Sequence, residues 1–368
     1  MEEAVIVRAR RTPIYKKNSA LGRVDVHELL VPLFQDIAAD LTDYIDDVIV
    51  SNAVSPGGNV ARLAVLSAGF PDSIPGLTID RQCSGGLDAV RLAAAFIESG
   101  MGDCYLVGAA ESVSTVTRPR ARFSPEAIGD PDMPAAAENV ARRHHISKDE
   151  QDAYTVRSYE RAWRAQKAGF FRREIVPVAG RSVDEAFLRQ RPIARLVSRA
   201  RSLEPGGTVT AANSCGLHDG AAALLVMSRK LAGQLSLVPV LTLVSGTVAG
   251  FSPLYPSIGP VKAIRSLIEK QKMKLEDVAH FEIIEAFAVK MVVSMRLLNL
   301  PEEKVNGCGG ALALGHPYSA SGIILLIHLF YRALSNPFSY AIAASGSGGG
   351  IGAALLVRSG KMMDRVWT

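Results

Sequence analysis

Cys83-Ser84-Gly85-Gly86 is the stretch from which the fold of this chain can be worked out. It follows a strand-like run over 74–80 and leads into a helix-like run over 87–99 that is apolar on nearly all sides. A second strand-like run follows over 104–110. A helix without a polar face must be covered on every side, so the helix over 87–99 is predicted to be buried. Strand, glycine-rich turn, buried helix and strand together indicate an α/β protein.

The same unit occurs again near the end of the chain. His316-Pro317-Tyr318-Ser319-Ala320-Ser321-Gly322 leads into an apolar helix-like run over 323–334 and then a strand-like run over 340–344. A further similarity links the strand-like stretches 220–228 and 351–359. Internal repetition of a strand–helix–strand unit predicts two related halves.

A stretch with a different sequence pattern separates the two halves. Residues 117–205 lack strong strand signals, so we predict that they form an inserted domain. The N-terminal half would then comprise residues 1–116 together with 206–235, and the C-terminal half residues 236–368.

The predicted insertion carries the positive charge of the chain. It contains 16 Arg and 2 Lys against 12 acidic residues, whereas the whole chain has a net charge of +5. A solvated helical surface and the attraction of a phosphorylated small molecule both explain this excess. Nucleic acid is not expected, because acidic residues are interleaved and few aromatic residues accompany the arginines. Within the insertion, Ser147 and Glu150 form a capping-box pattern that predicts a helix running to about residue 168.

Length and composition exclude several classes of protein. A chain of 368 residues with 48% hydrophobic and 21% charged residues is not disordered and can bury a large core. The longest apolar stretch, 320–331, is too short to cross a membrane. The acidic N-terminus does not resemble a secretory signal, and four cysteines are too sparse for a disulfide framework or a zinc site. We therefore expect a cytoplasmic protein with free thiols, no metal and no membrane partner.

Cys83 is the first candidate catalytic residue. The pattern places it at the start of a buried helix, where unpaired N–H groups and a partial positive charge favour a thiolate. The pKa of its thiol is therefore expected to fall. Gly85 and Gly86 leave room for a substrate to approach the backbone. The alternative is a buried structural cysteine.

His316 is the second candidate, at the start of the other buried helix. Pro317 fits the first turn of that helix, where its missing N–H costs nothing. Beside helix N-termini the imidazole is expected to stay neutral and to serve as a base or hydrogen-bond donor. If the halves are related by a pseudo-twofold axis, Cys83 and His316 occupy equivalent positions and converge on one site. The alternative is a histidine that only caps a turn.

A glycine-rich loop over 345–352 is the third candidate. Its backbone N–H groups suit an anion or a developing oxyanion. The Lys–Ser/Thr ending of a phosphate-binding loop is absent, and the loop precedes a strand and not a helix, which disfavours a dinucleotide site.

Over nearly its whole length the chain resembles the thiolase family, the acetyl-CoA acetyltransferases and 3-ketoacyl-CoA thiolases. The segments that carry the resemblance are 79–89 around Cys83, 136–152 at the start of the insertion, 212–222, and 309–317 around His316. The family fold implies a five-layered αβαβα core of two pseudo-symmetric halves with an inserted loop domain on the coenzyme A side. It also implies a homodimer or homotetramer, and no cofactor besides coenzyme A as substrate or product.

The resemblance implies specific roles in acyl transfer. Cys83 would attack an acyl-CoA thioester and become an acyl-enzyme, and His316 would activate it. The N–H groups of Cys83 and Gly348 would form the oxyanion hole. Ser245 resembles a serine that contacts the pantetheine arm of coenzyme A.

The chain departs from the family where carbon–carbon chemistry is expected. Gly346 stands where the family has a second cysteine, the acid/base for the α-proton of the second acyl-CoA. Ile284 replaces an asparagine that holds a water in the other oxyanion hole, and Ser319 replaces a glycine. Losing an acid/base group and an oxyanion donor costs about 10²–10⁴-fold and about 10²–10³-fold in rate, respectively.

The expected function is therefore a thiolase-type acyl-CoA acyltransferase of the acetyl-CoA C-acetyltransferase kind, with weak or altered Claisen activity. Two alternatives remain open. One is an acyl-CoA hydrolase or acyl carrier that uses the same Cys83, and the other is a catalytically silent scaffold that binds coenzyme A.

Overall fold

The computed structural model describes residues 2–54, 57–117 and 121–360. The strands are β1 (Ala4–Arg11), β2 (Tyr15–Lys16), β3 (Asp47–Ser51), β4 (Leu77–Ile79), β5 (Cys104–Glu111), β6 (His218–Ser228), β7 (Leu241–Gly250), β8 (His280–Ile283), β9 (Ala341–Ser347) and β10 (Ile351–Ser359). The helices are α1 (Val26–Ala38), α2 (Val60–Ser67), α3 (Gly85–Glu98), α4 (Met133–Arg143), α5 (Lys148–Lys167), α6 (Ile193–Arg199), α7 (Arg229–Gln234), α8 (Gly259–Gln271), α9 (Ala288–Leu298), α10 (Ala311–Leu314) and α11 (Ala320–Ser335).

The mixed sheet is built from two similar halves with corresponding strand orders. Its strand order is β4-β3-β5-β6-β1-β7-β10-β9-β8, with β2 paired to β6. Read outward from the centre, β1-β6-β5-β3 on one side corresponds to β7-β10-β9-β8 on the other. Within the described part of the sheet, the two halves pair through the antiparallel strands β1 and β7, at Val5 with Thr242 and Ile6 with Leu241. The two related halves predicted from the repeat are confirmed, as is the α/β class.

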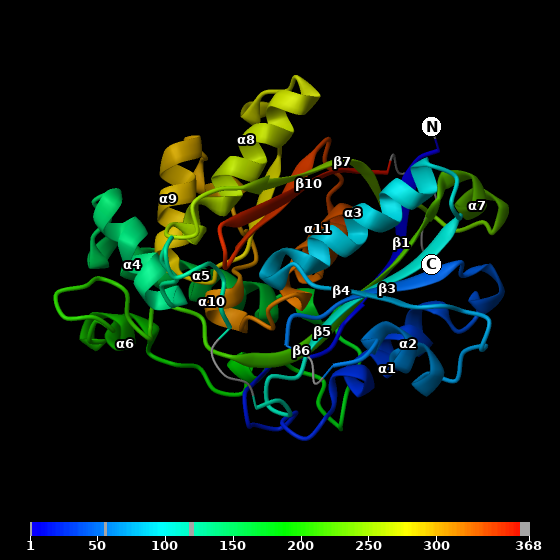
Figure 1. The fold of residues 1–368 in the computed structure, drawn as a ribbon, viewed down its shortest axis with the longest axis horizontal. Helices are drawn as coiled ribbons and strands as arrows, with labels where there is room; N and C mark the ends of the chain where they lie inside the picture. Colours follow the sequence, from blue (N-terminus) through cyan, green and yellow to red (C-terminus); the bar gives the residue numbers. More distant parts are fainter. Residues whose placement is uncertain (1, 55–56, 118–120, 361–368) are drawn as a thin grey trace.

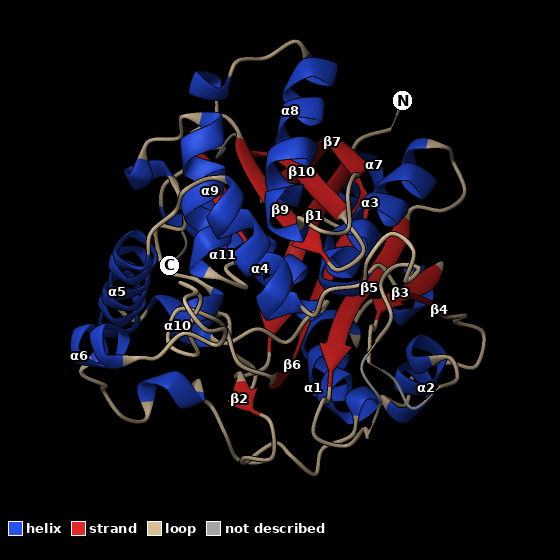
Figure 2. Cartoon of the chain, turned by 60° about the vertical axis from the view of Figure 1, so that its left-hand side comes forward, coloured by secondary structure: helices blue, strands red, loops and turns tan. Residues whose placement is uncertain are grey.

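Helices cover the sheet in layers, and Figure 1 and Figure 2 show the strands passing between them. Alternate residues of a strand face opposite sides of a sheet. In the first half, Leu106 and its neighbours on one face pack against α1 and α2. In the second half, Ile342 and its neighbours pack against α8 and α9. The opposite faces of both halves enclose α3 and α11 in one central core. This is the five-layered αβαβα arrangement expected from the sequence.

Glycines allow the two central helices to meet at their N-terminal ends. A Cβ at Gly86 would lie 2.3 Å from the carbonyl oxygen of Ser319, and one at Gly322 would lie 2.9 Å from the backbone nitrogen of Leu87. Such distances exclude side chains at both positions. The close approach brings the turn before α3 next to the loop before α11.

The segment 117–205 contributes α4, α5 and α6, and its described residues form none of the ten strands, although Ile175 makes an isolated parallel bridge with Arg11 of β1. Ser147 caps α5 with the predicted capping box, and α5 ends at Lys167 as expected. The helices α4 and α5 pack on α9, on the side of the molecule that carries the second half (Figure 2). The segment is also anchored to β1, because the fully buried Arg11 pairs with Glu174 at 2.8 Å and Asp184 at 2.7 Å. The domain boundaries remain predictions.

Membrane insertion through a helix finds no support in the part of the chain that the structure describes. None of its helices combines the length and the apolar character needed to span a bilayer.

Candidate active site

Cys83 lies in the short turn Gln82–Ser84, directly before α3, and is partly exposed. Serines hold this turn against the end of β9. The backbone N–H of Ser84 donates to Ser347 Oγ at 2.8 Å, and the hydroxyl of Ser84 lies 2.5 Å from Ser345 Oγ and 2.7 Å from Ser347 Oγ. The end of β9 therefore fixes the backbone on which the thiol is mounted.

His316 lies in the loop between α10 and α11 and faces Cys83. Its Nε2 is 3.3 Å from Cys83 Sγ, and its Nδ1 is 2.6 Å from Ser321 Oγ. A neutral ring that accepts the thiol proton at Nε2 must carry its own proton at Nδ1 and donate it to Ser321. The two side chains singled out in the sequence thus meet at one point.

One detail of the prediction around His316 is wrong. Pro317 does not occupy the first turn of the helix, because α11 begins at Ala320. Pro317 instead starts a separate turn, in which its carbonyl accepts the N–H of Ala320.

Burial controls the pKa values of the pair. His316 is 2% exposed, and burial lowers the pKa of its imidazole to about 3, so the ring is neutral near pH 7 as expected. The expected fall in the pKa of Cys83 is wrong for this structure. Burial raises the pKa of the thiol to about 11, which outweighs the opposing effect of the Lys290 ammonium. Cys83 is therefore a thiol at rest and must lose its proton during reaction.

The predicted oxyanion loop forms the turn between β9 and β10. Gly348 directly follows Ser347, whose hydroxyl contacts the residue after Cys83, so residues 83 and 348 lie on neighbouring backbone segments. The ring of Phe123 packs so closely on Gly348 that a Cβ there would lie 2.8 Å from it. An open pocket of about 360 Å³ adjoins this point, lined by Asp80, Arg81, Gln82, Arg122, Phe123, Gly348, Gly349 and Ile351.

Position 346 has no space for the cysteine of the family pattern. A Cβ on Gly346 would lie 2.8 Å from the carbonyl oxygen of Pro256 and 2.9 Å from Cδ of Pro260. The absence of a thiol is thus accompanied by neighbours that fill its place.

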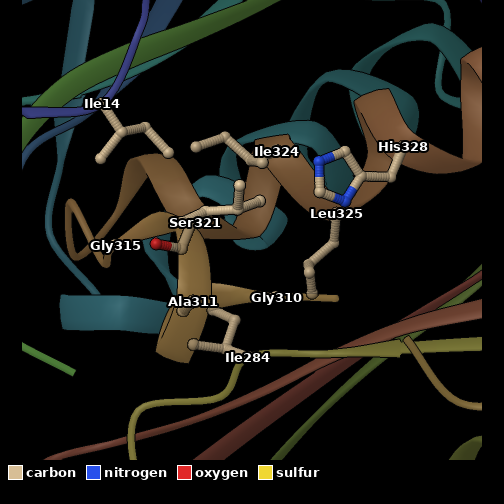
Figure 3. A pocket seen from close by; sticks show the side chains of 10 residues that line it. Ile14, Ile284, Gly310, Ala311, Gly315, Ser321, Ile324, Leu325 and His328 are labelled. Atoms are coloured by element: carbon tan, nitrogen blue, oxygen red, sulfur yellow. The ribbon is translucent and has the colours of Figure 1, made fainter. Parts of the chain in front are cut away.

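Ile284 lies behind the histidine loop. It lines a small interior cavity of about 20 Å³ together with Ser321, Gly315 and His328 (Figure 3). The cavity is too small for an acyl chain.

Two residues of the site were missed in the sequence. Lys290 is only 1% exposed, and its Nζ donates to the carbonyl oxygen of Gly346 at 3.0 Å. Cys215 is held beside the Ile284 loop by a 2.9 Å hydrogen bond from its N–H to the carbonyl of Ala286. A lysine inside the apolar run of α9 was the available signal for Lys290, since charged residues are almost never fully buried without a reason.

Ser245 does not lie beside Cys83, His316 and the glycine loop. It lies in mid-strand on β7 opposite Leu356, whereas Gly250 and Ile351 border the glycine loop. Ser245 and Gly250 are five positions apart along the strand, or about 16 Å. Contact of Ser245 with coenzyme A remains a prediction. Cys308 is also elsewhere, with its sulfur 3.4 Å from Arg332.

Metal ligation gains no support from the geometry. Within the described ranges, no three His, Cys, Asp or Glu side chains are placed to hold an ion.

Thiolases are built from two pseudo-symmetric halves with paired central helices. A cysteine and a histidine lie at the ends of those helices. The model of the thiolase N-terminal domain matches residues 4–230, and that of the thiolase C-terminal domain matches residues 237–359. The chain belongs to the thiolase family.

Similar proteins carry acetyltransferase names. The chain is 49% identical over 357 residues to the "Putative acetyl-CoA C-acetyltransferase YhfS" of Bacillus subtilis (strain 168), covering 96% of this chain and 98% of that protein. It is 39% identical to the "Putative acetyl-CoA C-acetyltransferase VraB" of Staphylococcus aureus (strain MSSA476), covering 97% and 99%. The crystal structure of the Bacillus anthracis acetyl-CoA acetyltransferase superposes with a TM-score of 0.92 at 33% identity, covering 98% and 99%.

Proposed function

We propose that this chain is an acyl-CoA acyltransferase of the acetyl-CoA C-acetyltransferase type that works through an acyl group on Cys83. The observation that carries the proposal is the 3.3 Å contact between Cys83 Sγ and His316 Nε2. The names of the relatives support acetyl-CoA as the substrate.

Acyl transfer would begin with removal of the thiol proton. His316 is neutral, so Nε2 accepts the proton as Sγ attacks the thioester carbonyl carbon. The C–S bond to coenzyme A breaks, and the imidazolium returns the proton to the departing sulfur. Ser321 stabilises the imidazolium by accepting a hydrogen bond from its Nδ1–H.

The negative charge of the tetrahedral intermediate would be stabilised by backbone N–H groups. Cys83 and Gly348 are our candidates, because Ser84 and Ser347 bind their segments to each other. Removing one such donor typically costs about 10²–10³-fold in rate. The ring of Phe123 packs on the Cα side of Gly348 and so borders this part of the candidate site.

Mass spectrometry of the Cys83 peptide tests this proposal. After incubation with acetyl-CoA, one acetyl group is expected on that peptide and none on the peptide containing Cys308, whose sulfur lies beside Arg332. A Cys308→Ala variant should be labelled like the parent, and a Cys83→Ala variant should not. An unlabelled Cys83 in a folded protein that binds coenzyme A would favour the scaffold alternative.

Hydrolysis is a second candidate function, favoured by the crowded glycine at position 346. If no group moves the α-proton of a second acyl-CoA, the acyl-enzyme can pass its acyl group only to a thiol or to water. Release of acetate from the labelled protein, without loss of acetoacetyl-CoA in the presence of coenzyme A, would identify this activity.

A further inference from the structure

Lys290 is a buried lysine for which acyl transfer has no use. It is the third residue of α9 and is 1% exposed, and the one hydrogen bond that its side chain makes in the described chain goes to the carbonyl of Gly346. No carboxylate within the described ranges lies at ion-pair distance from its Nζ. Burying an ammonium without a carboxylate partner costs free energy of folding. A chemical role for Lys290 would account for its burial.

The lysine shares its surroundings with the reacting groups. Lys290 binds Gly346, which directly precedes Ser347, and the Ser347 hydroxyl accepts the N–H of Ser84, the residue after Cys83. Lys290 thus lies close to the backbone that carries the thiol. Its ammonium also favours the thiolates of Cys83 and Cys215 and disfavours the imidazolium of His316.

The residue that Lys290 binds is the one whose side chain the family pattern requires. Gly346 cannot carry a thiol without displacing Pro256 and Pro260. The Nζ of Lys290, reaching in from α9, lies 3.0 Å from the backbone oxygen of that same residue. An ionisable group, the ammonium of Lys290, is thus present beside residue 346, and it comes from α9 and not from β9.

We propose that Lys290 is the acid/base residue of the carbon–carbon half of the reaction, exchanging the α-proton of the second acyl-CoA in place of the missing thiol. This inference rests on the proposed function, because it requires an acyl group on Cys83.

In condensation the neutral amine of Lys290 takes a proton from the α-carbon of the second acyl-CoA. The electron pair of that C–H bond forms the new C–C bond to the acyl carbon, and the C–S bond to Cys83 breaks. The proton then returns through the ammonium and His316 to the sulfur, which restores the thiol and the amine. In thiolysis each step runs in reverse, and the ammonium protonates the departing α-carbon.

Burial favours the neutral form of the lysine. It lowers the pKa of Lys290 below its ordinary value of 10.5, against the opposing effects of Cys83 and Cys215. A lysine with a lowered pKa gives up its proton more readily, which suits a general base.

Two assays on one protein separate the halves of the reaction. Exchange of labelled coenzyme A into acetyl-CoA needs only acyl transfer, whereas thiolysis of acetoacetyl-CoA also needs the carbon–carbon step. For Lys290→Met we expect exchange to stay within about tenfold and thiolysis to fall by about 10²–10⁴-fold. Lys304→Met is the matched control, since the Nζ of Lys304 also donates to backbone carbonyls, those of Glu276 and Val278. It should keep both activities.

Two readouts exclude a purely structural role. In Lys290→Ala, added alkylamines should restore thiolysis, and the restored rate should rise with the basicity of the amine. In the parent protein, thiolysis and condensation should both speed up as the pH rises through the titration of Lys290, since both directions start from its neutral amine, while exchange lacks this titration. The second readout needs no variant and holds even if substitutions at 290 prevent folding.

Several outcomes would overturn the inference. One is normal thiolysis by a folded Lys290→Met protein, and another is loss of thiolysis in Cys215→Ala but not in Lys290→Met. A parent protein that exchanges coenzyme A but never cleaves acetoacetyl-CoA would also overturn it, while leaving the acyl-enzyme on Cys83 intact. Failure of Cys83 to be acylated would instead reject the proposed function itself.

Discussion

The two sides of the candidate site differ in how closely they keep the thiolase pattern. On the acyl-transfer side, Cys83 directly precedes α3, His316 lies in the loop before α11, and their side chains are 3.3 Å apart. On the proposed carbon–carbon side, Gly346 and Ile284 stand where the family resemblance predicts a thiol and an amide, and the Nζ of Lys290 lies 3.0 Å from the carbonyl oxygen of Gly346. The pattern is thus kept where two halves must meet in fixed geometry. The pattern has changed on the side where the proton-accepting side chain can be supplied by more than one secondary-structure element.

The largest effect is expected from Cys83→Ala. Without the sulfur no acyl-enzyme forms, so coenzyme A exchange and thiolysis should both fall to background. Initial rates of both assays measure this. Cys308→Ala serves as the control with an equal loss of one thiol, and exchange above a tenth of the parent rate in Cys83→Ala would contradict the acyl-enzyme.

His316→Gln should follow, with exchange reduced by about 10²–10⁴-fold. The amide keeps part of the shape but cannot accept the thiol proton. Thiolysis should fall by at least as much, since it requires the same acyl-enzyme. If exchange fell less than tenfold, the imidazole would not be the base, and the 3.3 Å contact would be only a packing contact.

Gly346→Cys probes the crowding on the other side. Its Cβ would meet Pro256 at 2.8 Å, so we expect a loss of about 1–3 kcal/mol in the free energy of unfolding and no gain in thiolysis. Urea unfolding and the thiolysis assay measure the two quantities. Gly233→Cys is the control, because no atom lies within 4 Å of a Cβ there. A stable Gly346→Cys protein with tenfold faster thiolysis would show that the missing thiol had limited the reaction.

The smallest effect is expected in the pH dependence of stability. The pKa of His316 is about 3 in the folded chain, against 6.5 for an unperturbed histidine. The unfolded chain therefore binds a proton below pH 6.5 that the folded chain does not. This residue should lower the free energy of unfolding by about 1.4 kcal/mol per pH unit as the pH falls from 6.5 toward 3.

Urea unfolding of the parent and of His316→Gln at pH 7.5 and 5.5 checks this sign. The variant should lose less stability on acidification than the parent. His145→Gln, at an exposed position, should behave like the parent. Equal slopes for His316→Gln and the parent would mean that the buried imidazole is already charged in the folded protein.

Much of the fold was predictable from local pattern. The repeated turn–helix–strand unit predicted the two halves, and the capping box at Ser147 marked the start of α5. Cys83 and His316 were found because each precedes a helix with no polar face, a feature that depends only on neighbouring residues. The predicted fall in the pKa of Cys83 was wrong, because the helix end is visible in the sequence and the burial of the thiol is not.

The turn and the helix at the start of each repeated unit follow from local sequence, because turn glycines and apolar periodicity act over a few positions. The groups that surround the Cys83 thiol follow instead from how distant segments pack. Lys290 and Gly346 are 56 positions apart and belong to different elements, and their 3.0 Å contact arises from the packing of α9 against the end of β9. The space denied to a side chain at Gly346 likewise comes from Pro256 and Pro260, which no local pattern links to it. Conformational preferences of neighbouring residues thus fix the helices and strands. Packing between distant segments fixes the charges around the site and the space available in it.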